Sequence, residues 1–453
     1  MLAIVKSVTM ISSELDPFCI RGGTAYAIRR LADQLVELGI ETRVLLPDWV
    51  DTQLASGSPL LIPIPVKMRA EVRGAPVMVQ CNEFSRAAMA AFDQIKNNSG
   101  SDAVIAHGDE GAMFMVLRDG ERSGGPAVFW LHTLYDPPLS VFSKEQRRSL
   151  PSQSLLASAV MMADVVVTSS GVLKDAREFE WPNPLKELQN ALTIASAEHR
   201  VLTVESVGCL PVVPKNSENK LDLGSSLENL KDVLSPYVFF PGRPTVDKGF
   251  GIFGAIAERL RDDNVTCVAV RRPEPQPKRK RPFRQLVHWL PWLTQEELTV
   301  VMRNAICTVL PSITEAFGLA AAESVSLGVE TLYHPVGGHH VLESFPHAHP
   351  VALTSSERAQ LYRLWSDLIA TDPDSWPVWT RHEISLRPLI DRWVEAIRSI
   401  ACRGDAANAP TENSARRAEM IEAERWGSKL VRRIETHGTE DGDQVASGGI
   451  TAL

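Results

Sequence analysis

The sequence has few cysteines, no long apolar run and no excess of positive charge. Its six cysteines are scattered, without a Cys-x-x-Cys pair or a Cys/His cluster, which favours buried thiols in a reducing compartment over a zinc site. No stretch approaches the ~20 apolar residues that a membrane-spanning helix needs. The net charge of −8 argues against nucleic acid as the main partner.

The amino terminus also lacks the features of a secretory signal. Residues 1–10 are apolar, but the stretch is short, has no basic segment and runs into Glu14 and Asp16. It therefore predicts a first strand, and we expect a cytoplasmic protein. The 453 residues, 44% hydrophobic and 23% charged, are typical of a globular chain with two or three domains.

The amino-terminal half opens with a strand–helix–strand pattern. The strand Leu2–Ile11 is followed by Gly22 and Gly23, a helix that ends at Gly39, and a strand over Ile40–Leu46. This unit predicts a parallel sheet, and two glycines before a helix let the backbone approach a ligand closely. The expected apolar face of the helix consists of Ile28, Leu31, Leu35 and Leu38.

Further apolar segments predict strands that end in polar residues. His107 follows the segment Ala103–Ala106, and His132 follows Ala127–Leu131. Ligands of open parallel sheets collect at the carboxyl ends of strands, so these histidines are candidate site residues, His132 before His107. The alternative for each is a capping or satisfied histidine without a ligand.

The second half repeats this organisation with charged residues at the strand ends. After the predicted strand Tyr237–Phe240, the sequence Gly-Arg-Pro-Thr-Val-Asp-Lys-Gly places Arg243 and Lys248 on one loop. An arginine fork and a mobile lysine bind phosphate oxygens and stabilise a departing diphosphate without a metal ion. The alternative is a pair of exposed loop cations.

Residues 311–343 carry the most informative pattern. A short buried strand, 305–310, leads into a loop with Glu315, and a helix begins at Leu319 and is stopped by Gly328. The helix start is suited to an anion such as phosphate. Glu323 lies in the early turns of the helix, and carboxylates beside such a site accept hydrogen bonds from sugar hydroxyls. Phosphate and polyol together describe a sugar nucleotide; the alternative is a strand–loop–helix unit whose glutamates are merely solvated.

This stretch resembles the donor-site signature of the retaining glycosyltransferases of the GT-B fold, family 4 of the sugar-enzyme classification, also called group 1. The matching residues are Pro311, Ser312, Glu315, Phe317, Gly318, Leu319, Glu323, Gly328, Gly337 and Gly338.

The resemblance implies two doubly wound Rossmann-like domains that face a cleft. It implies transfer of a sugar from a nucleoside-diphosphate sugar to a hydroxyl acceptor, with retention of configuration and without cofactor or metal. The expected catalytic residues are Glu315, His132, Arg243 and Lys248. The expected donor-binding residues are Gly22, Gly23, Phe317, Gly318, Leu319 and Glu323.

The resemblance also predicts how the chain is divided. We expect an acceptor-side domain over 1–225, a donor-binding domain over 226–385 and helices over 386–436. One of those helices, within 386–400 or 418–434, is expected to cross back to the first domain. Residues 437–453 have the composition of a disordered tail.

Some segments depart from the family pattern. His339 and His340 follow Gly337-Gly338, where the family has a glutamate three residues after the glycines. Adjacent histidines rarely share one ion, so we expect no metal.

The basic stretch 275–284 is either a solvated loop or a clamp for an anionic acceptor or membrane surface. The expected acceptor is a hydroxyl-bearing small molecule, glycan or lipid-linked molecule. A non-catalytic sugar-nucleotide-binding subunit and an epimerase or phosphorylase on the same fold are the alternatives.

Overall fold

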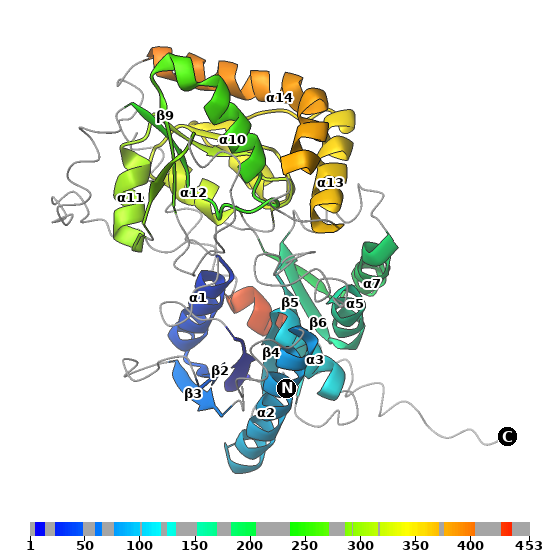
Figure 1. The fold of residues 1–453 in the computed structure, drawn as a ribbon. Helices are drawn as coiled ribbons and strands as arrows, with labels where there is room; N and C mark the ends of the chain where they lie inside the picture. The colour runs from blue at the N-terminus through cyan, green and yellow to red at the C-terminus, as the bar shows by residue number, and fades with distance from the viewer. Residues whose placement is uncertain are drawn as a thin grey trace. The chain divides into compact units, whose positions relative to one another are not determined.

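The computed structural model describes most of the chain and divides it into two compact units (Figure 1). The described residues are 5–13, 23–48, 59–65, 77–99, 102–118, 125–132, 152–169, 183–204, 236–270, 286–291, 293–315, 318–370, 376–403 and 427–436.

The first unit is built on a parallel sheet with the strand order β3-β2-β1-β4-β5-β6-β7. The chain runs outward from β1 in one direction and then from β4 in the other, so the topological switch lies between β1 and β4. The strands are β1 (Ser7–Ile11), β2 (Glu41–Pro47), β3 (Leu60–Ile64), β4 (Ala103–His107), β5 (Ala127–Leu131), β6 (Val165–Ser169) and β7 (Val201–Val204).

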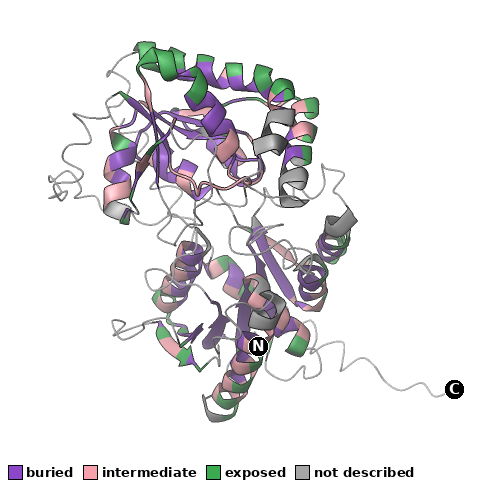
Figure 2. Ribbon diagram, viewed as in Figure 1, coloured by how far each residue is buried: buried purple, intermediate pink, exposed green. Residues whose placement is uncertain are grey.

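Helices cover this sheet, and α2, α3, α5 and α7 pack each against the next. The helices of the unit are α1 (Gly23–Glu37), α2 (Val77–Ser99), α3 (Gly108–Arg118), α5 (Ser152–Met162) and α7 (Asn183–Ala197). Strands β1, β4 and β5 are buried along their whole length, as expected for a parallel sheet with helices on both faces (Figure 2).

Helix α1 shows how far its periodic pattern holds. Ile28, Leu31 and Leu35 are completely buried, which confirms most of the predicted apolar face. Leu38 is 39% exposed, so its assignment to that face was wrong. The helix has already ended there, and Gly39 turns the chain in the left-handed region, with φ of 77°, where glycine carries no steric penalty.

The second unit has a parallel sheet with the order β10-β9-β8-β11-β12-β13, and its topological switch lies between β8 and β11. Its strands are β8 (Tyr237–Phe240), β9 (Thr266–Val270), β10 (His288–Leu290), β11 (Cys307–Leu310), β12 (Thr331–Tyr333) and β13 (Ala348–Pro350). Two doubly wound parallel sheets are therefore present, as predicted from the sequence.

The helices of the second unit begin and end at local signals. They are α10 (Phe250–Arg259), η2 (Arg261–Asp263), α11 (Gln295–Arg303), α12 (Leu319–Ser326), η3 (Gly337–Ser344), α13 (Ser355–Ala370) and α14 (Trp376–Arg403). Thr294 and Glu297 form a reciprocal capping box at the start of α11. Gly328, with φ of 76°, follows α12 and stops it, as predicted.

The carboxy-terminal helices differ from their predicted ranges. Helix α14 begins at Trp376, ten residues before the predicted segment 386–400, and continues through Pro388. A second helix spans 427–436 and belongs to the first unit, where the Gly427 N–H donates to Gln34 Oε1 at 2.9 Å. The basic stretch 275–284 lies outside the described residues.

Candidate active site

The candidate site of the second unit lies at the carboxyl ends of the two strands beside its topological switch. The loop 241–249 follows β8 and carries Arg243, Asp247 and Lys248. The loop after β11 carries Ser312 and Glu315. Because neighbouring parallel strands end at the same sheet edge, these two loops meet, and ligands of open α/β sheets bind at such a point.

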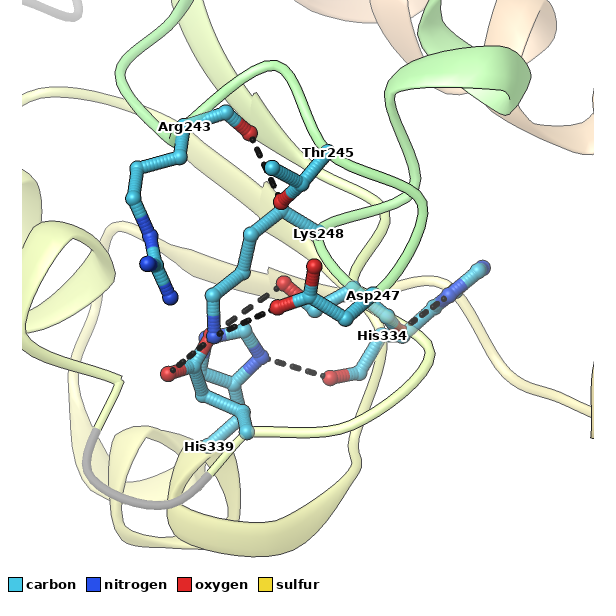
Figure 3. A network of polar contacts seen from close by, with 8 residues as sticks. Arg243, Thr245, Asp247, Lys248, His334 and His339 are labelled. Atoms are coloured by element: carbon cyan, nitrogen blue, oxygen red, sulfur yellow. Dashed lines mark hydrogen bonds and ion pairs between the residues drawn. The ribbon is translucent and has the colours of Figure 1, made fainter. Parts of the chain in front are cut away.

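Lys248, labelled in Figure 3, forms the centre of this site together with Glu315. Lys248 Nζ donates to both Glu315 oxygens, each at 3.0 Å, and lies 3.7 Å from Asp247 Oδ2. The Lys248 side chain is 20% exposed and that of Glu315 is 13% exposed. One ammonium group is thus held between two carboxylates and remains partly accessible to solvent.

Electrostatics keeps all three groups ionised. Burial by itself would raise the pKa of Glu315, but the neighbouring Lys248 ammonium group favours the carboxylate, and the pKa is lowered. Burial would lower the pKa of Lys248, yet Glu315 and Asp247 outweigh it, and the pKa is raised. The pKa of the Asp247 carboxyl is lowered against its burial, chiefly by Lys248 and Arg243.

The two loops are fastened to each other by their backbones. The Ile313 N–H donates to the Asp247 carbonyl at 2.8 Å. Gly249 has φ of 72°, and a Cβ there would lie 1.9 Å from the Pro311 carbonyl oxygen, so only glycine fits this close approach. Ser312 Oγ donates to Glu315 Oε2 at 3.2 Å and helps to fix the carboxylate.

Helix α12 begins directly beside this site. Its N-cap, Gly318, has φ of 64° and supplies no side-chain cap, so the first turn keeps unsatisfied N–H donors. A Cβ on Gly318 would lie 2.5 Å from His339 Cδ2, which places the His339 ring against the helix start. An uncapped helix N-terminus beside a lysine favours an anion.

A chain of hydrogen bonds links His339, His334 and Trp393 to the loop after β11. His339 Nδ1 donates to the His334 carbonyl at 2.9 Å, and His334 Nδ1 donates to the Ser312 carbonyl at 3.0 Å. The indole N–H of Trp393, on α14, donates to His334 Nε2 at 3.0 Å. Burial lowers the pKa of His334 to about 3, consistent with this neutral, fully bonded imidazole.

Arg243 lies on the same loop as Lys248, and Figure 3 shows the two side chains extending in the same direction from it. Its carbonyl accepts from the Thr245 N–H at 2.7 Å, which tightens the loop. The predicted pair of cations is therefore present on one loop, but the sequence reading missed that carboxylates already neutralise Lys248. Asp247, directly before Lys248, was the available signal.

The other predicted donor-side residues are placed as follows. Glu323 lies in the second turn of α12 and is buried, with 6% exposure. Leu319 is the first residue of that helix. Gly23 is the first residue of α1 in the first unit. Gly22 and Phe317 lie outside the described residues.

The first unit holds a second polar cluster at the carboxyl ends of β4 and β5. His107 Nδ1 and His132 Nε2 share a hydrogen bond of 3.0 Å, and the Trp130 ring stacks on His132 with centroids 4.4 Å apart. Both histidines are almost completely buried. Burial lowers the pKa of His132 to about 3. The pKa of His107 is also lowered, mainly by burial and to a smaller extent by His132. The two histidines were predicted separately, and the pairing of neighbouring strands brings them together.

Within the described residues, no helix is long and apolar enough to cross a membrane. The same part of the chain contains no group of three histidine, cysteine, aspartate or glutamate side chains arranged to hold a metal ion.

Comparisons with known proteins agree with this architecture. Residues 229–344 match the family model of the glycosyl transferases group 1, and residues 7–87 match that of the starch synthase catalytic domain. No curated protein matches the chain by sequence.

Solved structures match over nearly the whole chain. The catalytic domain of starch synthase IV from Arabidopsis thaliana, bound to ADP and acarbose, is 14% identical and gives a TM-score of 0.56 over 93% of this chain and 99% of that chain. Sucrose-phosphate synthase from Thermosynechococcus elongatus, also 14% identical, gives 0.52 over 88% and 100%. At this identity the likeness shows the fold.

Fold and family matches together define a glycosyltransferase of the GT-B fold that uses a nucleotide-sugar donor. Its second unit carries a group 1 glycosyl transferase domain, the family that retains the anomeric configuration. The predicted fold, family and class of reaction are confirmed.

Proposed function

We propose that the second unit binds the diphosphate of the donor at Lys248, Arg243 and the start of α12. The observation that carries this proposal is the Lys248–Glu315 pair beside an uncapped helix N-terminus. Two cations and a set of free N–H groups converge there from the ends of β8 and β11. Such an arrangement stabilises charge on a departing diphosphate without requiring a metal ion.

Donor binding would then exchange partners inside the site. In the ligand-free structure Glu315 occupies two of the three N–H donors of Lys248. A diphosphate competes with Glu315 for that ammonium group, and the released carboxylate becomes an acceptor for sugar hydroxyls. Glu323, buried on α12, would accept hydrogen bonds from the ribose diol.

The resemblance to the family also assigns donor contacts to residues of the first unit. By that resemblance, Gly22 and Gly23 would bind the diphosphate and His132 would contact the sugar. The buried and neutral state of His132 suits a hydrogen bond to a hydroxyl better than proton abstraction, because a base with a pKa of about 3 is weak at neutral pH. The leaving phosphate would take the acceptor's proton, which is consistent with retention.

The acceptor is proposed as a hydroxyl-bearing small molecule, glycan or lipid-linked sugar, and the location as the cytoplasm. Contact with a membrane surface would be peripheral. Composition supports these proposals only in general terms, through the acidic net charge and the scattered cysteines.

The test is calorimetric titration of the chain with UDP-glucose, ADP-glucose and GDP-mannose, before and after Lys248→Met. At least one donor should bind the wild type, and the variant should bind it about 10- to 100-fold more weakly, the usual cost of a hydrogen bond to a charged group. Arg259→Met is the matched control, since Arg259 forms an exposed ion pair with Asp391 on the same unit. Equal affinity in the Lys248 variant would contradict the assignment of the site.

A further inference from the structure

His339 is a completely buried histidine of the second unit whose ring approaches the carboxylate of the candidate site. Among the residues that the structure describes, none offers a hydrogen-bond partner to its Nε2. Nδ1 donates to the His334 carbonyl, and a carbonyl can only accept, so Nδ1 carries the hydrogen. In the neutral ring, Nε2 is therefore a bare lone pair. It faces Glu315, whose Oε2 lies 3.9 Å away.

The groups around this ring decide its protonation. Glu315 approaches from the loop after β11, Lys248, Asp247 and Arg243 from the loop after β8, and His334 from the end of β12. Its neighbour His340 lies on the same helix, η3, and pairs with Glu343 at 3.2 Å. The edge of the Tyr333 ring packs against it, with centroids 5.5 Å apart. Without ligand, the four charges of Lys248, Arg243, Asp247 and Glu315 cancel.

That balance changes when a diphosphate enters. The proposed function requires Lys248 to turn toward the phosphates, which leaves Glu315 as a mostly buried carboxylate without its cation. An unpaired buried charge is costly, and a protein responds by finding a new partner or by changing a protonation state. The group in position to respond is His339, because protonation at Nε2 places an N–H donor opposite Glu315 Oε2.

We propose that His339 is a positioning residue that replaces Lys248 as the partner of Glu315 when the donor binds, so that binding takes up one proton from the buffer. The proton adds to the Nε2 lone pair, and the new N–H donates to Glu315 Oε2. Glu315 then keeps its place with its other oxygen open to the donor sugar. In the ligand-free site, burial lowers the pKa of His339, and Lys248 adds to this effect against Glu315, so the site begins in the neutral form.

The experiment is calorimetric titration at pH 7.5 in phosphate and in Tris, which differ in ionisation enthalpy, with the tightest of UDP-glucose, ADP-glucose and GDP-mannose. The phosphates of a nucleotide sugar do not titrate near this pH, so a buffer-dependent heat reports proton uptake by the protein. The wild type should take up about one proton per donor, and its affinity should rise as pH falls, by up to about tenfold per pH unit.

Two variants assign the proton. His339→Gln, or His339→Asn if that variant melts early, should abolish the uptake and flatten the pH dependence of the affinity. His340→Gln, the neighbouring and partly exposed histidine, should keep both. A purely structural role for His339 would weaken binding but leave the buffer dependence unchanged, and that result, like equal uptake in wild type and His339→Gln, overturns the proposal. If the wild type binds no nucleotide sugar, it is the proposed function that fails.

Discussion

The second unit places its polar residues at the topological switch between β8 and β11, whereas the first unit places a pair of histidines at the ends of β4 and β5, with the opposite electrostatic character. In the second unit, Lys248, Asp247 and Glu315 are all charged, mutually paired and partly exposed. In the first, His107 and His132 are neutral and buried, and the Trp130 ring stacks on His132 and lies tilted against His107. A charged site that can exchange partners suits an anion, whereas a neutral, aromatic-backed site suits uncharged hydroxyls.

The largest expected effect comes from removing a cation of the charged site. Lys248→Ala and Arg243→Ala should each lower turnover about 100- to 1000-fold, and affect it more than they weaken donor binding, because charge on the diphosphate grows toward the transition state. Steady-state kinetics with the identified donor measures this split.

Activity should also persist in EDTA, since the cations take the place of a metal. Loss of activity in EDTA that a divalent ion restores would contradict the assignment, and so would a variant that changes the Michaelis constant alone.

The second largest effect is expected for Glu323, the residue proposed to bind the ribose of the donor. Glu323→Ala should weaken nucleotide binding by roughly 1.5–3 kcal/mol, because it removes the acceptor proposed for the ribose hydroxyls. Titration with the nucleoside diphosphate measures the loss, and the exposed Glu258 on α10 provides a control position for the same substitution. Unchanged affinity in Glu323→Ala would remove the ribose assignment.

Two glycines, one in each unit, differ in how much space their surroundings leave for a side chain. Gly318 and Gly39 both have positive φ, but a Cβ meets His339 Cδ2 at 2.5 Å in the first case and nothing within 4 Å in the second. Gly39→Ala should cost about 1–2 kcal/mol of unfolding free energy from the left-handed backbone alone. Gly318→Ala should cost more and also weaken donor binding. Thermal melts and titration test both, and equal destabilisation would mean that the contact with His339 yields easily.

The smallest expected effect tests the neutral character of the first unit. The pKa of His132 is about 3 in the folded protein and 6.5 in an exposed reference, so the unfolded chain binds more protons between these values. Stability therefore rises with pH from about 3 to 6.5 and is complete above that range. His132→Gln should reduce this slope by up to about 1.4 kcal/mol per pH unit.

Urea unfolding followed by circular dichroism between pH 4.5 and 6.5 measures the slope. An unchanged slope would mean that His132 takes up its proton as readily in the folded protein as in the unfolded chain. The histidine cluster of the first unit could then not be contrasted as neutral with the charged cluster of the second unit.

The class of fold, the family and the candidate residues could all be predicted from the amino-acid sequence. Strand–helix alternation predicted two parallel sheets, and the loop 311–318 with its helix start predicted an anion site beside carboxylates. These features are local, because apolar periodicity and turn residues act over a few positions. The bounds of α14 were missed because its first turns lack that periodicity and Pro388 reads as a helix breaker.

Only the tertiary structure decided which of those residues interact. Lys248 and Glu315 are 67 positions apart, and their pairing depends on β8 and β11 lying side by side at the switch point. His107 and His132 became one neutral pair through the register of β4 and β5. The role proposed for His339 depends on its burial against Glu315, His334 and Gly318, which come from separate segments. Protonation state depends on distance and desolvation, and both are properties of the assembled sheet rather than of any stretch of sequence.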